Sequence, residues 1–232
     1  MQGVIVSGVG NGMGCAIARY LSEKGFRVAV MSRSDGGKHV ANMIGADFLR
    51  CDLRDPDSVR EALDIFTGRG GSLDHVVHAA GGYFRKASIA ETDFQFFADA
   101  VMNNAATFFN IVKAAVPLMK GKWGSITAVS AARHVYINSN PGYAAGKGAI
   151  NLMVEEMAKE LAPVNIRVNA VAPGFISKES CGSGAEETLL GKGRHPAIPV
   201  AMTVHWLISG QAVTGQVVTV DSGFNLQLPD GL

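Results

Sequence analysis

Tyr143 and Lys147 stand four residues apart in the stretch YAAGK. On a helix this spacing places a phenol and an ammonium group on one face, close enough to interact. At about 5 Å and an effective dielectric near ~20, Coulomb's law favours the phenolate by roughly 3 kcal/mol, or about 2 pKa units. We therefore expect a pKa of about 8 for Tyr143, which suits proton exchange with a substrate. The alternative is a solvated helix face, because this spacing is common by chance.

A glycine-rich segment follows the first apolar run of the chain and precedes a helical pattern. It reads SGVGNGMG over residues 7–14, with Gly8, Gly12 and Gly14 in a GxxxGxG spacing. Such glycines permit a tight turn and the close approach of a pyrophosphate, whose charge is favoured at a helix N-terminus. A plain strand-to-helix turn is the alternative. The residues of this segment that we expect to contact a dinucleotide are Ser7, Gly8, Asn11, Gly12, Met13 and Gly14.

The elements that must position these residues follow from the apolar pattern, which alternates between strand and helix along the chain. Strands are predicted at residues 3–8, 27–31, 46–53, 73–79, 124–129, 166–171 and 216–220. Helices are predicted at 13–24, 56–66, 92–102, 106–119, 141–161 and 200–209. Two of these helices start with a capping residue and a proline, at Asp55-Pro56 and Asn140-Pro141.

This alternation predicts an α/β fold. We expect a single Rossmann-type domain over residues 1–232, in which a doubly wound parallel sheet of about seven strands carries helices on both faces. Residues 177–196 form the one break in composition, glycine-rich and polar, and a substrate loop is expected at about 175–198.

Composition and charge exclude several classes of function. Of the 232 residues, 47% are hydrophobic and 18% charged, which is not the composition of a disordered chain. The formal net charge is +1, so there is no basic excess to bind nucleic acid. The three cysteines contain no CxxC pair, and no metal site is expected. Without a positively charged leader or a long apolar stretch, the chain is expected to be cytoplasmic and free of membrane contact.

Six ordered motifs together resemble the classical short-chain dehydrogenase/reductase family over residues 3–223. The glycine turn resembles the family's TGxxxGxG, with Ser7 in place of threonine, and Tyr143 with Lys147 matches YxxxK. Ser130 precedes Tyr143 by 13 residues, as the family's catalytic serine does, and Asn104 matches the helix asparagine of the tetrad. The segments IRVNAVAPG at 166–174 and TGQ with VDSG at 214–223 resemble further family motifs.

The resemblance implies a mechanism and four catalytic residues. Tyr143 would act as the general acid in reduction and as the base in oxidation. Lys147 would lower the pKa of Tyr143 and hold the nicotinamide ribose. Ser130 would hydrogen-bond the substrate oxygen, and Asn104 would hold a water that links Lys147 to solvent. The implied activity is hydride transfer between a nicotinamide cofactor and a carbonyl or secondary alcohol. The alternative is a dinucleotide-binding regulator or scaffold of the same fold that has lost catalysis.

The resemblance also implies further cofactor contacts, and one motif departs from the family. The family's NNAG sequence reads HAAG here, so His78 is expected to be structural, while Ala80 and Gly81 are retained. Further contacts are expected from Asp52 and Leu53 beside the adenine and from Pro173, Gly174 and Ile176.

The choice between the two nicotinamide cofactors depends on the end of the second strand. Enzymes of this family that use NAD carry an acidic residue there, whereas this chain has Ser32 followed by Arg33. A serine does not repel a 2′-phosphate and an arginine can bind it bidentately, so NADP is favoured. NAD remains possible, because Asp35 lies near enough in sequence to act instead.

The sequence indicates only the general class of the substrate and of the assembly. A small carbonyl or alcohol is the expected substrate, bordered by Tyr83, Phe84 and Phe175 and by the polar side chains of Arg85, Arg133 and His134. Family members are commonly tetramers, and residues 141–161 carry the small side chains that close packing between subunits requires. A homotetramer is therefore expected.

Overall fold

The protein is described here by a computed structural model that covers residues 1–119, 121–176 and 196–224. Seven strands form one parallel sheet in the order β3-β2-β1-β4-β5-β6-β7. The strands are β1 (Gly3–Ser7), β2 (Arg27–Ser32), β3 (Asp47–Arg50), β4 (His75–His78), β5 (Gly124–Val129), β6 (Ile166–Pro173) and β7 (Val217–Val220). The predicted doubly wound α/β fold is thereby confirmed.

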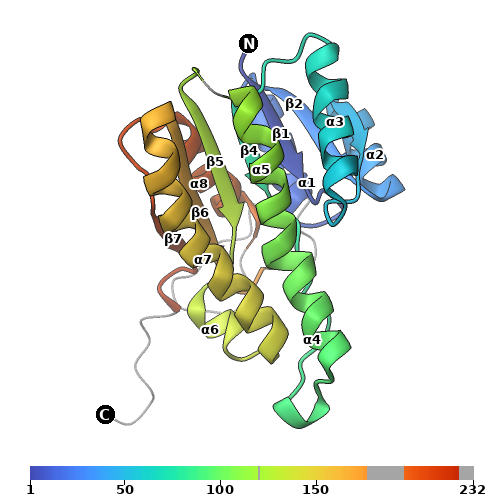
Figure 1. Ribbon diagram of the computed structural model, residues 1–232, viewed down its shortest axis with the longest axis vertical. Helices are drawn as coiled ribbons and strands as arrows, with labels where there is room; N and C mark the ends of the chain where they lie inside the picture. The colour runs from blue at the N-terminus through green and yellow to red at the C-terminus, as the bar shows by residue number, and fades with distance from the viewer. Residues whose placement is uncertain (120, 177–195, 225–232) are drawn as a thin grey trace.

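Helices cover both faces of the sheet (Figure 1). One face packs against α3 (Pro56–Gly68), α5 (Thr107–Met119) and α7 (Pro141–Leu161), and the other against α1 (Met13–Glu23), α2 (Asp35–Ile44) and α8 (Ile198–Ser209). Residues of β1 alternate between the two cores: Ile5 belongs to the first, and Val4 and Val6 to the second. A sheet buried on both faces explains why its strands are apolar at successive positions rather than at alternate ones.

Of the remaining elements, four follow the carboxyl end of β4 or β5, and the last, a 3-10 turn between α7 and β6, lies at the amino edge of the sheet. They are α4 (Phe94–Val101), the π-helical turn η2 (Met102–Ala106), α6 (Arg133–Tyr136) and the short 3-10 turns η1 (Ile89–Glu91) and η3 (Ala162–Val164). In Figure 1, α4 and α5 follow each other as nearly one rod, joined by η2. The strand order reverses direction at β1 and β4, and ligands of such sheets bind outside the carboxyl ends at that point.

Two helix starts confirm the capping signals in the sequence. The Asn140 side chain accepts a hydrogen bond from the backbone N–H of Tyr143 at 2.8 Å, and α7 begins at Pro141. In the same way Asp55 caps α3, accepting from the N–H of Asp57 at 3.0 Å. The cap at Asn140 fixes the first turn of the helix that carries Tyr143 and Lys147.

Other boundaries differ from the prediction. Helix α2 was not predicted, because Gly36 and Gly37 in its first turn disfavour a helix. The structure explains Gly37: a Cβ there would lie 2.4 Å from the Cβ of Ser32, so only glycine lets this helix pack against the end of β2. Most of the predicted substrate loop, residues 177–195, lies outside the described part of the chain. Within the described segments, no helix combines the length and the apolar character needed to cross a bilayer.

His78, the departure from the NNAG motif, is fully buried at the end of β4. Its Nδ1 lies 3.1 Å from the hydroxyl of Ser7 in β1, and its Nε2 lies 3.3 Å from the hydroxyl of Thr107 in α5. Both ring nitrogens therefore have partners, as expected of a structural histidine. Burial lowers the pKa of His78 to about 3 and that of the neighbouring buried His75 to about 4.

These two histidines make folding stability sensitive to acid. Their folded-state pKa values lie below the ordinary 6.5, so the unfolded chain takes up protons first as the pH falls. Stability present above about pH 6.5 is then lost toward pH 4, by up to about 1.4 kcal/mol per pH unit for each ring. We expect His78→Asn, which does not titrate, to reduce this slope by up to about 1.4 kcal/mol per unit between pH 6.5 and 5.

Urea unfolding at a series of pH values measures the slope. His39→Asn is the matched control, because His39 is exposed on α2 and its replacement should leave the slope unchanged. A slope that is identical in wild type and in His78→Asn would contradict the assignment.

Candidate active site

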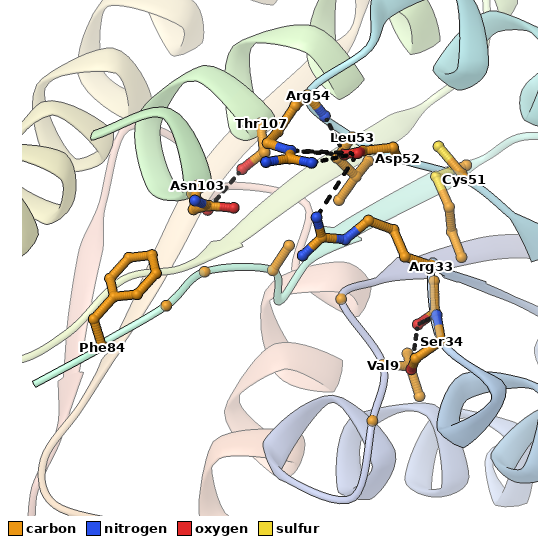
Figure 2. A pocket seen from close by; sticks show the side chains of 17 residues that line it. Val9, Arg33, Ser34, Cys51, Asp52, Leu53, Arg54, Phe84, Asn103 and Thr107 are labelled. Carbon is orange, nitrogen blue, oxygen red and sulfur yellow. Dashed lines mark hydrogen bonds and ion pairs between the residues drawn. The ribbon is translucent and has the colours of Figure 1, made fainter. Parts of the chain in front are cut away.

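A cavity of about 350 Å³ opens at the carboxyl ends of β1, β2 and β3 and beside the loop after β4 (Figure 2). Its existence depends on Gly8, whose backbone has a φ of +74°, which favours glycine. A Cβ at Gly8 would lie 2.2 Å from the Cα of Ala80, so only glycine lets the turn after β1 meet the loop after β4. This is the strand-order switch point, where backbone rather than side chains can approach a phosphate.

The cavity contains part of the cofactor-binding set that the sequence predicts. Its predicted members are Gly8, Ser32, Arg33, Asp52, Leu53, Ala80 and Gly81. The predicted residues that do not line it are Ser7, Asn11, Gly12, Met13, Gly14, Tyr143, Lys147, Pro173, Gly174 and Ile176. Ser7 is fully buried and bound to His78, which places its side chain behind the cavity wall rather than in it.

Sequence reasoning missed further lining residues. They are Val9, Gly10, Met31, Ser34, Cys51, Arg54, Asn103 and Thr107. Gly82 and Phe84 also line the cavity, in a segment that was expected to border the substrate rather than the cofactor. Most of the missed residues adjoin predicted ones at a strand end, so proximity to the motifs was an available signal. Asn103 directly precedes the predicted Asn104 in the π-helical turn η2, whereas Thr107 had no such signal, because it reaches the cavity from the start of α5.

Two arginines converge on one carboxylate at the rim of the cavity (Figure 2). Arg54 lies 2.8 Å from Asp52, and Arg33 lies 3.7 Å from the same carboxylate. The hydrogen bond from Arg54 is the largest cause that lowers the pKa of Asp52 to about 2, so Asp52 is ionised at neutral pH. Asp35, the alternative acidic residue, pairs instead with Arg50 at 2.5 Å and does not line the cavity.

The four residues predicted to be catalytic come from three elements. Tyr143 and Lys147 lie on α7, Ser130 directly follows β5, and Asn104 lies in the π-helical turn η2. All four are buried, with exposed fractions of 9% or less. The Lys147 ammonium donates a hydrogen bond to the backbone oxygen of Val129 at 2.9 Å and lies 5.7 Å from the centre of the Tyr143 ring. The helix thus places phenol and ammonium near each other, as predicted.

The predicted pKa of Tyr143 is wrong for this structure. Burial raises the pKa of the Tyr143 phenol to about 12, with a smaller contribution from Tyr83, rather than lowering it to about 8. Burial also lowers the pKa of Lys147 to about 8. Each group loses water on burial, which disfavours both charged forms and outweighs the attraction between them.

Asn104 and Lys147 approach each other across Gly81. The Asn104 amide nitrogen donates to the backbone oxygens of Ala100 at 2.8 Å and Gly82 at 3.2 Å. Its amide oxygen is buried and has no hydrogen-bond partner among the described residues. A Cβ at Gly81 would lie 2.5 Å from this oxygen and 3.1 Å from the Lys147 nitrogen. An unpaired acceptor near a buried cation is the arrangement that a bridging water would satisfy.

Aromatic side chains border the reacting groups. The Tyr83 ring meets that of Tyr143 edge to face at 5.5 Å between centroids. His134, Phe175 and Phe224 form a separate cluster of three rings, with His134 at 5.5 Å from Phe175 and 4.8 Å from Phe224 between centroids. In the described segments, no three side chains of the types that ligate metals gather in one place. Tyr143, Lys147 and Ser130 carry groups that can donate a proton or stabilise a charge.

Comparisons with known proteins agree with this geometry. A family model described as enoyl-(acyl carrier protein) reductase matches residues 8–225. A 3-oxoacyl-[acyl-carrier-protein] reductase of Bos taurus is 31% identical, covering 96% of this chain and 98% of the relative. One from Thermotoga maritima is 34% identical, over 94% and 96%.

A solved structure shares the fold along nearly its whole length. A short-chain type dehydrogenase/reductase from Mycobacterium marinum has a TM-score of 0.88 and 27% identity, covering 97% of this chain and 96% of that one. The motifs, the sheet order and these relatives agree, and this chain belongs to the short-chain dehydrogenase/reductase family of NAD(P)-dependent oxidoreductases.

Proposed function

We propose that this protein catalyses hydride transfer between NADP(H) and a small carbonyl compound or the corresponding secondary alcohol. The observation that carries the proposal is the grouping of four side chains next to the cavity-lining residues Gly81 and Gly82. They are those of Tyr143, Lys147, Ser130 and Asn104. A scaffold that only binds dinucleotide has no use for all four side chains.

Residues of this chain fit a bound dinucleotide. The backbone of the glycine turn and the N-terminus of α1 suit its phosphates, and Gly8 leaves the room that a Cβ would fill. Asp52 and Leu53 would hold the adenine, while Pro173, Gly174 and Ile176 would lie beside the nicotinamide. When bound, the nicotinamide supplies or accepts the hydride.

The residues that transfer the proton lie on α7. With a pKa raised to about 12, Tyr143 is protonated at neutral pH and serves as the acid that donates to the carbonyl oxygen in reduction. Lys147, whose pKa is about 8, is mostly charged at pH 7 and stabilises the phenolate that forms. Ser130 hydrogen-bonds the substrate oxygen. Asn104 holds a water through its unpaired amide oxygen and so links Lys147 to solvent.

The preference for NADP rests on charge at the cavity rim. Arg33 lines the cavity at the end of β2, and the nearby acidic residue Asp35 is paired with Arg50. Arg33 is thus available to a 2′-phosphate, at the cost of leaving Asp52, from which it lies 3.7 Å away. Because Arg54 also neutralises Asp52, that carboxylate keeps a partner when Arg33 moves.

The proposed partners are a small-molecule substrate and further copies of this chain, in a cytoplasmic homotetramer. The outer face of α7 supports this assembly, since Leu152 is 69% exposed there and small residues such as Ala145 and Gly148 flank it. No nucleic-acid or membrane partner is proposed.

Replacing Tyr143 by phenylalanine should remove turnover and leave cofactor binding intact. Loss of the proton donor is expected to lower kcat for carbonyl reduction by about 10²–10⁴-fold, the usual contribution of a general acid. The affinity for NADPH should stay within about twofold, because the ring remains. A panel of aldehydes and ketones, followed by NADPH absorbance, measures the first effect, and fluorescence titration measures the second.

Tyr20→Phe on α1 is the matched control and should behave as wild type. Wild-type turnover in Tyr143→Phe would refute the proposed role. Tight dinucleotide binding by wild type without reduction of any carbonyl in the panel would favour the scaffold alternative.

Arg33→Ala should weaken NADPH binding selectively. A charge-assisted hydrogen bond to the 2′-phosphate contributes about 1.5–3 kcal/mol, so the Kd for NADPH should rise by roughly 10- to 100-fold. The Kd for NADH should change less than about twofold. Arg60→Ala, exposed on α3, serves as the control. Equal changes for both cofactors, or none, would overturn the preference for NADP.

The pH profile of carbonyl reduction should show the loss of the positive charge on Lys147. Tyr143 keeps its proton to about pH 12, whereas Lys147 loses its charge as the pH rises through about 8. The kcat/KM for reduction should therefore fall above pH 8, since that ratio reports groups of the free enzyme. Lys147→Arg, with a cation that does not titrate in this range, should have a lower rate but no such fall. An alkaline limb near pH 8 that persists in Lys147→Arg would assign the limb to another group.

A further inference from the structure

We propose that Asn151 is a positioning residue for Ser130 and sets the direction of its hydroxyl proton. Asn151 lies on α7, one helical turn beyond Lys147 and two beyond Tyr143. The Ser130 hydroxyl donates to the Asn151 amide oxygen at 2.6 Å. The inference rests on the proposed function, in which Ser130 contacts the substrate oxygen.

The surroundings of Ser130 leave little besides Asn151 to orient its side chain. Its backbone N–H is held by the oxygen of Val171 at 2.8 Å, so the main chain is fixed. The residue is 3% exposed. The other described acceptor for its hydroxyl is the backbone oxygen of Lys147, at the longer distance of 3.4 Å. The shorter bond to Asn151 is the stronger one and selects the side-chain rotamer.

The hydroxyl has a single proton, and its direction matters for the reaction. While that proton is directed at Asn151, Ser130 offers a carbonyl substrate only lone pairs, and a carbonyl oxygen needs a donor. An amide carries an acceptor oxygen and a donor nitrogen on the same carbon. When the Asn151 amide turns over, its NH₂ donates to the Ser130 oxygen, and the hydroxyl proton is free for the substrate oxygen.

The need for both proton arrangements explains why asparagine stands at position 151. Asparagine is a poorer helix former than alanine, yet it stands well inside a helix of 21 residues. Its amide supports both proton arrangements, because it carries an acceptor oxygen and a donor nitrogen. Aspartate would accept the Ser130 proton in either orientation of its carboxylate. Alanine would neither accept that proton nor donate to the Ser130 oxygen.

A double-mutant cycle tests the proposal. Asn151→Ala should lower kcat for carbonyl reduction by about tenfold, the effect of about one lost hydrogen bond, with the Kd for NADPH unchanged within about twofold. In a Ser130→Ala background, Asn151→Ala should change kcat by less than about twofold, because the residue it acts through is gone. Asn151→Asp should be at least as slow as Asn151→Ala.

Glu160→Ala, exposed on the last turn of the same helix, is the control for effects on the helix and should leave kcat unchanged. A tenfold loss that persists in the Ser130→Ala background would show that Asn151 acts structurally and would overturn the proposal. Full activity of Asn151→Ala would overturn it as well.

Crystal structures of wild type and Asn151→Ala with NADP⁺ supply a readout independent of turnover. Wild type should keep the Ser130 oxygen within hydrogen-bond distance of Asn151, and in Asn151→Ala that oxygen should turn toward the backbone oxygen of Lys147. An unchanged Ser130 rotamer in the variant would refute the positioning role. If wild type reduces no carbonyl, the proposed function fails, while the rotamer comparison still decides the role of Asn151.

Discussion

A cation buried inside the protein is the constraint on which the site depends. Lys147 is 5% exposed, and burial lowers its pKa from 10.5 to about 8. That shift corresponds to about 3 kcal/mol against keeping the ammonium charged at neutral pH. The Asn140 cap, the backbone oxygen of Val129 and the glycine at position 81 together hold this group in place. In the proposed mechanism this unfavourable charge has a use, because it stabilises the phenolate of Tyr143 when that forms.

The parts of this site that the sequence predicted are those fixed by local rules. The Asn140-Pro141 start placed α7, and spacing along that helix brought Tyr143 and Lys147 together. The features it missed depend on contacts between distant segments. The pKa of Tyr143 follows from burial by its neighbours, and the approach of Arg33 to Asp52 appears only when β3 is placed beside β2. Motif spacing carries no information on such desolvation or on such pairings.

The HAAG sequence shows how a motif can change while the strands stay tied together. His78 is bound to Ser7 on β1 and to Thr107 on α5, so one ring links the central strand, its neighbour and a helix. The Thr107 hydroxyl also donates to the backbone oxygens of Asn103 and Asn104, at 3.1 and 3.0 Å. His78 is therefore connected through Thr107 to the π-helical turn η2, which carries the predicted catalytic residue Asn104. Its ring is neutral, because burial lowers its pKa to about 3.

The π-helical turn at Met102–Ala106 limits which deletions this part of the chain can tolerate in evolution. One extra residue in a helical turn rotates the next helix by about 100°, so α4 and α5 present different sides to their surroundings. α4 lies against α7, where a Cβ on Gly142 would meet Ala100 at 2.7 Å, while α5 faces α3 and the sheet. Losing one residue from this turn would therefore rotate α4 relative to α5, and one of the two helices would no longer face the surface it packs against.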